Sequence, residues 1–233
     1  MLTKTRAIVL HHVKYGESSL ILNLYTEQFG RTACIVSGVR SHKPRFPATL
    51  FQPLHMLDVD IYYRRSREMH RLKEVSGLIH FQTIPFNISK STIALFLAEV
   101  LMHCLREEES NPPLFAFLFH SFQLFDASDE GYPYFHHWFL VQLSRYLGFL
   151  PHEQLIAGNL SQVHDLPVFG NLSPDSLEAL RSMAGCTSGP PGQLGVNHAG
   201  RTELLESIIR YYSLHMDGFT RLKSYAVLQE VFR

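Results

Sequence analysis

The first 75 residues place apolar side chains at every second position rather than in a helical rhythm. Alternation of this kind is typical of antiparallel strands that bury one face and expose the other. The clearest examples of an apolar face are Leu20, Leu22, Leu24, Leu57, Val59 and Ile61. The pattern predicts five strands, near residues 4–14, 18–26, 31–37, 51–63 and 68–75.

Short segments with turn chemistry, such as "YGES" and "EQFG", separate these strands. Five short antiparallel strands in so few residues predict a small closed barrel. A five-stranded OB-fold is the main candidate, and barrels of that kind commonly bind single-stranded nucleic acid. An SH3-like barrel is compatible with the same pattern.

From about residue 88 the apolar positions follow a helical period, and six helices are expected in the rest of the chain. The stretch 135–147 carries an apolar stripe at a spacing of four, and Gly148 is placed to end that helix. Asn111 and Ser173 stand where the N-caps of two other helices are expected. The stretch 185–200 is rich in Gly and Pro and is expected to be a mobile loop.

The two patterns together predict an α+β multidomain fold. An N-terminal five-stranded OB-fold barrel over residues 1–78 is followed by a C-terminal all-helical domain over residues 79–233. Apolar runs fall short of the roughly 18–20 residues of a transmembrane helix, and the charged N-terminus does not resemble a signal peptide. We therefore expect a cytoplasmic protein without a membrane partner. Three widely spaced cysteines favour neither a disulfide framework nor a cysteine zinc site.

A net charge of zero hides two halves of opposite sign. Residues 1–75 hold 12 Lys and Arg against 6 Asp and Glu, whereas residues 76–233 hold 9 against 15. Charge asymmetry between halves indicates a charged partner, here a nucleic acid for the first half. Two ordinary domains with a chance imbalance are the alternative explanation.

The cations of the first half concentrate on the predicted turns and loops, where they can follow a phosphate backbone. The clearest example is the segment "SGVRSHKPRF", residues 37–46, which has three permanent cations and no carboxylate. The candidate DNA-binding residues are Lys14, Arg31, Arg40, Lys43, Arg45, Arg64, Arg65 and Arg67. Five aromatic residues offer stacking faces for bases if they point outward: Tyr15, Tyr25, Phe46, Tyr62 and Tyr63.

Catalytic motifs with the required spacing do not occur in the sequence. We found no phosphate-binding GxxxxGK[ST] or GxGxxG pattern, and no HExxH, GxSxG or EF-hand pattern. We therefore expect no enzymatic activity, no catalytic residue and no metal or other cofactor. Asp58 and Asp60 keep one alternative open, a metal-dependent hydrolase or nuclease, although a polar strand face is the favoured explanation of this pair.

Several short motifs in the chain resemble the RecO family of bacterial recombinational repair mediators. They occur in the family's order and extend along nearly the whole chain, with most of the similarity in the first half. The matching segments are "AIVL" at 7–10, "YGES" at 15–18, "LYTEQFGR" at 24–31, "GVR" at 38–40, "LFQPL" at 50–54 and "LKSYAVL" at 222–228.

The resemblance implies an OB-fold followed by a helical domain. It further implies binding of single- and double-stranded DNA, annealing of complementary strands, and cooperation with RecR and single-stranded DNA-binding protein in loading RecA. RecF and RecA are the further partners to consider. Arg31 and Arg40 fall on motif positions, and Lys43 and Arg45 extend the same basic loop.

The chain departs from the family at one point. Many members carry a four-cysteine zinc module in the second half, where this chain has only Cys186, so we expect a zinc-free version. A protein-binding adaptor and an RNA-binding barrel remain as alternative functions, because the residues alone do not separate them from a DNA mediator.

Overall fold

The computed structural model describes residues 1–129, 132–150, 168–192, 194–217, 219 and 222–232. Contacts divide the chain into two compact units. Unit 1 comprises Met1–Asp126 and Leu222–Arg233, and unit 2 comprises Ala127–Arg221. The sequence places its boundary at the change from strand to helix, residues 78 and 79, whereas contacts group the first two helices with the barrel.

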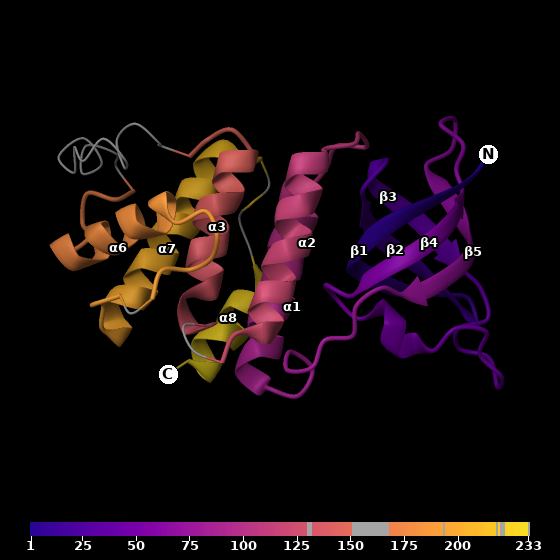
Figure 1. Ribbon diagram of the computed structural model, residues 1–233, viewed down its shortest axis with the longest axis horizontal. Helices are drawn as coiled ribbons and strands as arrows, with labels where there is room; N and C mark the ends of the chain where they lie inside the picture. The colour runs from indigo at the N-terminus through magenta and orange to yellow at the C-terminus, as the bar shows by residue number, and fades with distance from the viewer. Residues whose placement is uncertain (130–131, 151–167, 193, 218, 220–221, 233) are drawn as a thin grey trace. The chain divides into compact units, whose positions relative to one another are not determined.

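Unit 1 begins with a closed barrel of five strands in the order β1-β2-β3-β5-β4 (Figure 1). Neighbouring strands are antiparallel except β3 and β5, which run parallel. The predicted five-stranded OB-fold barrel followed by helices is thus confirmed. The strands are β1 (Leu2–Tyr15), β2 (Ser19–Thr26), β3 (Gly30–Val36), β4 (Met56–Tyr62) and β5 (Met69–Gly77).

The fourth expected strand is too long at its beginning. Residues 48–51 form a 3-10 helix, η1 (Ala48–Phe51), and β4 starts only at Met56. Phe51 is fully buried in the barrel core, which explains why its segment looked like part of a strand. Apolar burial alone does not distinguish a strand from a short helix that covers the end of a barrel.

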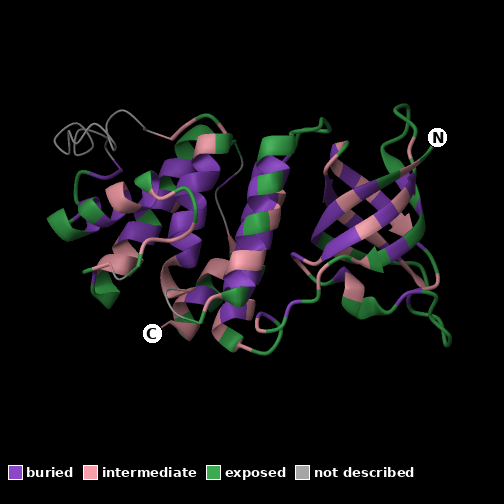
Figure 2. Ribbon diagram, in the orientation of Figure 1, coloured by how far each residue is buried: buried purple, intermediate pink, exposed green. Residues whose placement is uncertain are grey.

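The apolar residues of the predicted alternation form the core of the barrel. Along β3 and the first six residues of β2 every second residue is buried, and the intervening residues are partly exposed (Figure 2). The buried set includes Leu20, Leu22, Leu24, Cys34, Val36, Leu57, Val59 and Ile61. These strands therefore present an outer face whose side chains are available for contacts.

Three helices complete unit 1: α1 (Ile88–Cys104), α2 (Pro112–Ala127) and α8 (Lys223–Val231). Asn111 is confirmed as an N-cap, because its side-chain oxygen accepts the amide of Leu114 at 3.1 Å. The start of α8 is capped from α1. The carboxylate of Glu99 accepts the amides of Lys223 at 3.0 Å and Ser224 at 2.8 Å, and the Ser224 hydroxyl as well.

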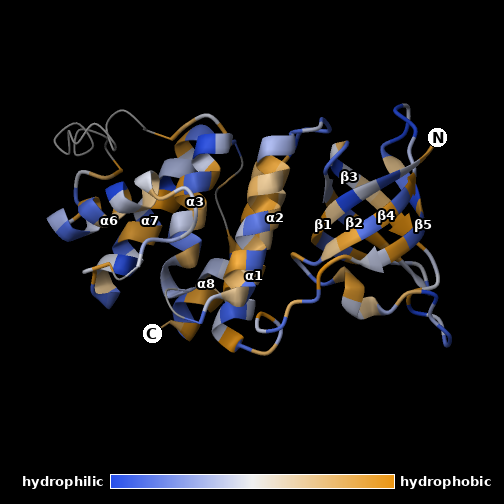
Figure 3. Cartoon of the chain, in the orientation of Figure 1, coloured by the Kyte–Doolittle hydropathy of each residue, from blue (hydrophilic) through white to orange (hydrophobic). Residues whose placement is uncertain are grey.

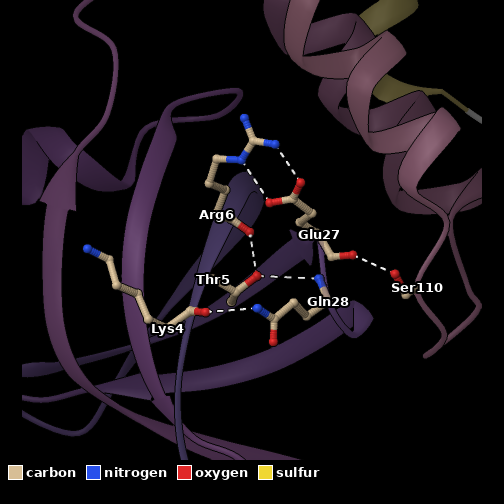
Figure 4. A network of polar contacts seen from close by, with 6 residues as sticks. All are labelled: Lys4, Thr5, Arg6, Glu27, Gln28 and Ser110. Atoms are coloured by element: carbon tan, nitrogen blue, oxygen red, sulfur yellow. Dashed lines mark hydrogen bonds and ion pairs between the residues drawn. The ribbon is translucent and has the colours of Figure 1, made fainter.

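The barrel is fastened to α1 and α2 through the turn between β2 and β3. The backbone amide of Arg31 donates to the carbonyl of Glu107 at 2.9 Å, and the Ser110 hydroxyl donates to the carbonyl of Glu27 at 2.8 Å (Figure 4). Gly30 has a φ of +62°, and a Cβ there would come within 3.0 Å of backbone atoms of Glu107 and Glu109. Only glycine satisfies both the conformation and the close approach.

Arg6 adds a second contact between the barrel and α2. Its Nε donates to Glu27 at 2.8 Å (Figure 4). Its guanidinium carbon lies 5.4 Å and 4.9 Å from the ring centres of Phe115 and Phe119. A cation held over two aromatic rings is attracted by their negative faces. This arginine is therefore committed to the fold rather than to a ligand.

The described residues of unit 2 form η2 (Tyr132–Tyr134) and three α-helices, α3 (Phe135–Tyr146), α6 (Pro174–Gly185) and α7 (His198–His215). All six expected helices are thus present. Ser173 is confirmed as the N-cap of α6, and Gly148 ends α3 with a φ of +83°. The expected loop 185–200 is wrong at its C-terminal end, because α7 begins at His198 after its N-cap Asn197.

Residues 135–144 of α3 are all buried, and two of them are adjacent histidines. His136 and His137 are each 3% exposed, and their ring centres lie 4.2 Å apart. Burial lowers the pKa of His137 to about 4, and burial together with His137 and Arg201 lowers the pKa of His136 well below its usual range. Both rings are therefore neutral at pH 7.

None of the described helices is long and apolar enough to cross a membrane.

Replacing Gly30 by alanine is expected to destabilise the protein by about 2–4 kcal/mol, because φ strain and a backbone clash add together. The matched control is Gly16→Ala, since Gly16 has a φ of +57° but nothing within 4 Å of its virtual Cβ. The control should cost only about 1–2 kcal/mol for the backbone conformation. Urea unfolding measures both, and equal losses would contradict the close packing of this turn.

Acid is expected to weaken unit 2 before the carboxylates titrate. Because the folded pKa of His137 is lowered, its contribution is complete above pH 6.5 and is lost as the pH falls towards about 4. The slope for one such histidine is about 1.4 kcal/mol per pH unit within that window. His137→Gln keeps a donor for the carbonyl of Arg201 without a titrating ring. Urea midpoints at pH 7, 6 and 5 should therefore fall less steeply for this variant than for the wild type, and parallel profiles would contradict the assignment.

Candidate nucleic-acid interface

Two exposed basic segments lie at opposite ends of the barrel. We call residues 37–47 the basic loop, which follows β3, and residues 63–68 the basic turn, which connects β4 and β5. The start of β5 pairs with the middle of β3 (Met69 with Ala33), and the two strands then run in the same direction. The basic turn therefore lies at the end of the barrel where the paired part of β3 and β5 begins. The basic loop lies at the end where β3 finishes (Figure 1).

Lys14 and Arg40 are brought together at the end that carries the basic loop. Lys14 pairs with Leu20, and Leu20 pairs with Val36, the last residue of β3. The amide of Arg40 donates to the carbonyl of Ser18 at 3.0 Å, which ties the loop to the turn between β1 and β2. Both Lys14 and Arg40 are exposed, so two predicted cations share one surface.

The remaining cations of the basic loop differ in their surroundings. Lys43 is exposed. Arg45 forms an ion pair with Glu74 at 2.6 Å, and its guanidinium carbon lies 5.1 Å from the ring centre of Phe46. Both partners of the ion pair are about half exposed, and pairs of that kind contribute little to stability. A phosphate can therefore replace Glu74 as the partner of Arg45 at small cost.

The three arginines of the basic turn point their charged groups into solvent rather than into contacts with the fold. Arg64, Arg65 and Arg67 are exposed. None of their three guanidinium groups has an ion pair or hydrogen bond within the described part of the chain. The backbone of the turn is ordered, because the amide of Arg67 donates to the carbonyl of Arg64 at 3.0 Å. Figure 3 shows mainly hydrophilic colours in the connections at the two ends of the barrel, whereas hydrophilic and hydrophobic residues are mixed along its strands.

Two cations on β5 lie between these segments and were missed in the sequence. Arg71 and Lys73 are exposed, whereas their neighbours His70 and Leu72 are buried. Arg71 pairs with Ile35 of β3 and with Tyr62 of β4. The alternation within "HRLK" was the signal that could have identified them, because a strand with His70 and Leu72 inside must place Arg71 and Lys73 outside.

Arg31 differs from the other candidates. Its Nη1 donates to the carbonyls of Met102 at 3.0 Å and Leu105 at 3.2 Å, at the C-terminal end of α1. Burial lowers its pKa, nearby Arg106 acts in the same direction, and Glu108 opposes them. The side chain thus neutralises the negative end of a helix, and its contact with DNA stays a prediction.

The aromatic candidates divide by exposure. Tyr15 is 52% exposed and Tyr62 is 46% exposed, so both offer a face to a base. Tyr25 and Phe46 are buried, at 3% and 7% exposed, so neither meets the condition of an outward-pointing ring that stacking on a base requires. Each fills a space in the fold: Phe46 belongs to the barrel core, and Tyr25 stacks against Phe115 of α2. Tyr63 stacks on the rings of Phe29 and His70.

The acidic pair of β4 belongs to a polar strand face. Asp58 forms an ion pair with Lys4 of β1 at 2.7 Å, as the pairing of β1 with β4 allows. Within the described ranges no group of three His, Cys, Asp or Glu side chains is placed to hold a metal ion. This face of β4 is therefore a charged strand surface.

Comparison with known proteins gives the family. The model of the recombination protein O N-terminal domain matches residues 1–81, and that of its C-terminal domain matches residues 85–155. Proteins named DNA repair protein RecO from Bacteroides fragilis, Phocaeicola vulgatus and Christiangramia forsetii are 36%, 37% and 36% identical to this chain. In each pair the alignment covers 100% of both chains. The barrel, its helices and these similarities agree, and the chain belongs to the RecO family of DNA repair proteins.

Proposed function

We propose that this protein is a non-catalytic mediator of DNA repair and recombination that binds single- and double-stranded DNA. The observation that supports this most directly is the placement of two exposed cations of β5, Arg71 and Lys73, between the basic turn and the basic loop. The proposed phosphate contacts are Lys14, Arg40, Lys43, Arg45, Arg64, Arg65, Arg67, Arg71 and Lys73. Arg31 stands at the margin of this set, because its guanidinium already binds two helix carbonyls.

The length of the first part of β5 suits a strand of DNA. Met69 and Lys73 are four positions apart on β5, and a strand rises about 3.3 Å per residue, which gives roughly 13 Å. The phosphates of one strand of a duplex recur about every 3.4 Å of helix axis, so several phosphates can be contacted at once. The exposed rings of Tyr15 and Tyr62 supply stacking faces that do not depend on base sequence.

Annealing follows from the same charges. Two complementary strands repel each other through their phosphates, and a cationic surface that holds one strand reduces this repulsion when the second approaches. We infer that the protein brings complementary strands together in this way. No bond is made or broken, so the activity requires positioning and charge but no catalytic residue or cofactor.

Protein partners are the second part of the proposal. As a RecO family member, the protein is proposed to act with RecR and with single-stranded DNA-binding protein, so that RecA loads on coated DNA, with RecF as a further partner. The part of the chain after residue 75 carries 9 Lys and Arg against 15 Asp and Glu. An acidic surface of this kind repels DNA and leaves the helices for protein contacts. We propose that this mediator acts in the cytoplasm.

Removing charge from the basic loop is expected to weaken DNA binding in a salt-dependent way. The double variant Arg40→Gln, Lys43→Gln loses two proposed phosphate contacts, and the slope of log K against log salt should become shallower by about 1.4. Fluorescence anisotropy of a labelled single-stranded oligonucleotide at several salt concentrations measures this slope. The control Arg181→Gln, Arg210→Gln removes the same charge from unit 2 and should leave the slope unchanged. Equal effects would mean that net charge, rather than this surface, controls binding.

The cations of β5 are expected to matter as much as those of the basic loop. Arg71→Gln, Lys73→Gln should reduce the slope by a similar amount, because both side chains are exposed between the two basic segments. The same titration with a complementary second strand tests annealing, which should slow in parallel. Wild-type affinity and slope in this variant would show that DNA does not pass along β5.

A further inference from the structure

A column of three aromatic rings supports the basic turn. Phe29, in the turn between β2 and β3, stacks on Tyr63 with ring centres 3.8 Å apart and planes 6° apart. Tyr63 stacks on His70 of β5 at 4.5 Å and 25°. Two nearly parallel rings at these distances cannot share one face of Tyr63, so its ring is enclosed between the other two. Tyr63 therefore offers no face to a base.

The backbone of the turn is tied to the column and to the N-terminus. The amino group of Met1 donates to the carbonyl of Tyr63 at 3.0 Å, and the amide of Tyr63 donates to the carbonyl of Met1 at 2.9 Å. The amide of Arg64 donates to Nδ1 of His70 at 3.4 Å. The backbone of Tyr63 is thereby held by Met1, and the amide of Arg64 is held by His70. The side chains of the three arginines of the turn are exposed to solvent.

His70 must be neutral at Nδ1 to accept this hydrogen bond, because a protonated imidazole is a donor at both nitrogens. His70 is only 6% exposed. Burial lowers its pKa, Glu108 opposes this effect, and Arg67 adds to it. The ring is therefore neutral at pH 7 and available as an acceptor for the turn.

We propose that Phe29, Tyr63 and His70 form a positioning device that fixes the basic turn for DNA. A flexible turn loses conformational freedom when it binds, and that loss weakens affinity. A turn already held by the column presents Arg64, Arg65 and Arg67 in place. The inference rests on the proposed function, and it assigns to these rings a role in orienting phosphate contacts rather than in touching DNA.

Substitutions of Tyr63 test the column directly. Tyr63→Leu removes the central ring but none of the cations. Its affinity for a labelled single-stranded oligonucleotide should fall about 3- to 10-fold at every salt concentration, with the salt slope unchanged. Tyr63→Phe keeps the stack and should bind as the wild type does. A changed slope in Tyr63→Leu would overturn the positioning role, because it would mean that phosphate contacts themselves were lost.

Two variants of His70 separate the ring from its acceptor. His70→Phe keeps a ring in the column but cannot accept from the amide of Arg64, whereas His70→Asn keeps an acceptor near the position of Nδ1. The hydrogen bond is expected to matter, so His70→Phe should bind DNA more weakly than His70→Asn. Amide hydrogen exchange of Arg64 and Arg67 should accelerate in Tyr63→Leu and His70→Phe, while urea unfolding reports whether the barrel remains folded.

A triple variant distinguishes failure of this inference from failure of the proposed function. Arg64→Gln, Arg65→Gln, Arg67→Gln should lower affinity and make the salt slope shallower by about 2. If this variant binds less while folded Tyr63→Leu and His70→Phe bind normally, the column has no positioning role. If the triple variant also binds normally, the basic turn is not part of the DNA surface, and the proposed function fails at this site. If Tyr63→Leu does not fold, His70→Phe alone decides the outcome.

Discussion

The turn between β2 and β3 is the contact on which the arrangement of unit 1 depends. The last turn of a helix leaves carbonyl groups without donors, and Arg31 supplies two of them for α1. This is possible only because Gly30 lets the backbone approach the segment after α1 at a distance that no side chain permits. At this turn the barrel is therefore held to the helices through backbone atoms, the Ser110 hydroxyl and Arg31, and Arg6 adds its contact with α2.

The cations of the barrel consequently fall into two groups. Lys4, Arg6 and Arg31 are engaged with carboxylates, aromatic rings or helix carbonyls and stabilise the fold. The cations of the basic turn, together with Arg71 and Lys73, are exposed. The positive balance of the first 75 residues therefore overstates the charge available to a ligand. A basic residue in the sequence is a candidate for phosphate contact only until its side chain is shown to have a structural partner.

Two carboxylates, the buried Asp126 and the partly buried Glu99, bind backbone amides close to where the chain leaves unit 1 and returns to it. Asp126, at the end of α2, accepts the amides of Gln82 at 2.7 Å and Thr83 at 2.8 Å. Burial works to raise its pKa, but these and neighbouring hydrogen bonds outweigh burial and lower it. Glu99 does the same at the start of α8, where the hydrogen bonds from Ser224 and Lys223 outweigh burial. Each carboxylate accepts hydrogen bonds from several backbone amides that would otherwise lack a partner. The end of α2 and the start of α8 are therefore both held by bonds between a side-chain carboxylate and the main chain.

The sequence by itself located the five strands and the six expected helices, with Asn111 and Ser173 as N-caps, because alternation, helical period and capping residues act over a few neighbouring positions. It also located the basic loop and the basic turn, since loops are where unpaired charge accumulates. Tertiary structure alone decided which charges are free: Arg31 is used by α1, Arg45 pairs with Glu74, and Arg71 joins the two basic segments through the parallel pairing of β5 with β3. The orientation of Tyr25, Phe46 and Tyr63 was decided in the same way, because their partners lie far away in the chain and no local pattern identifies them.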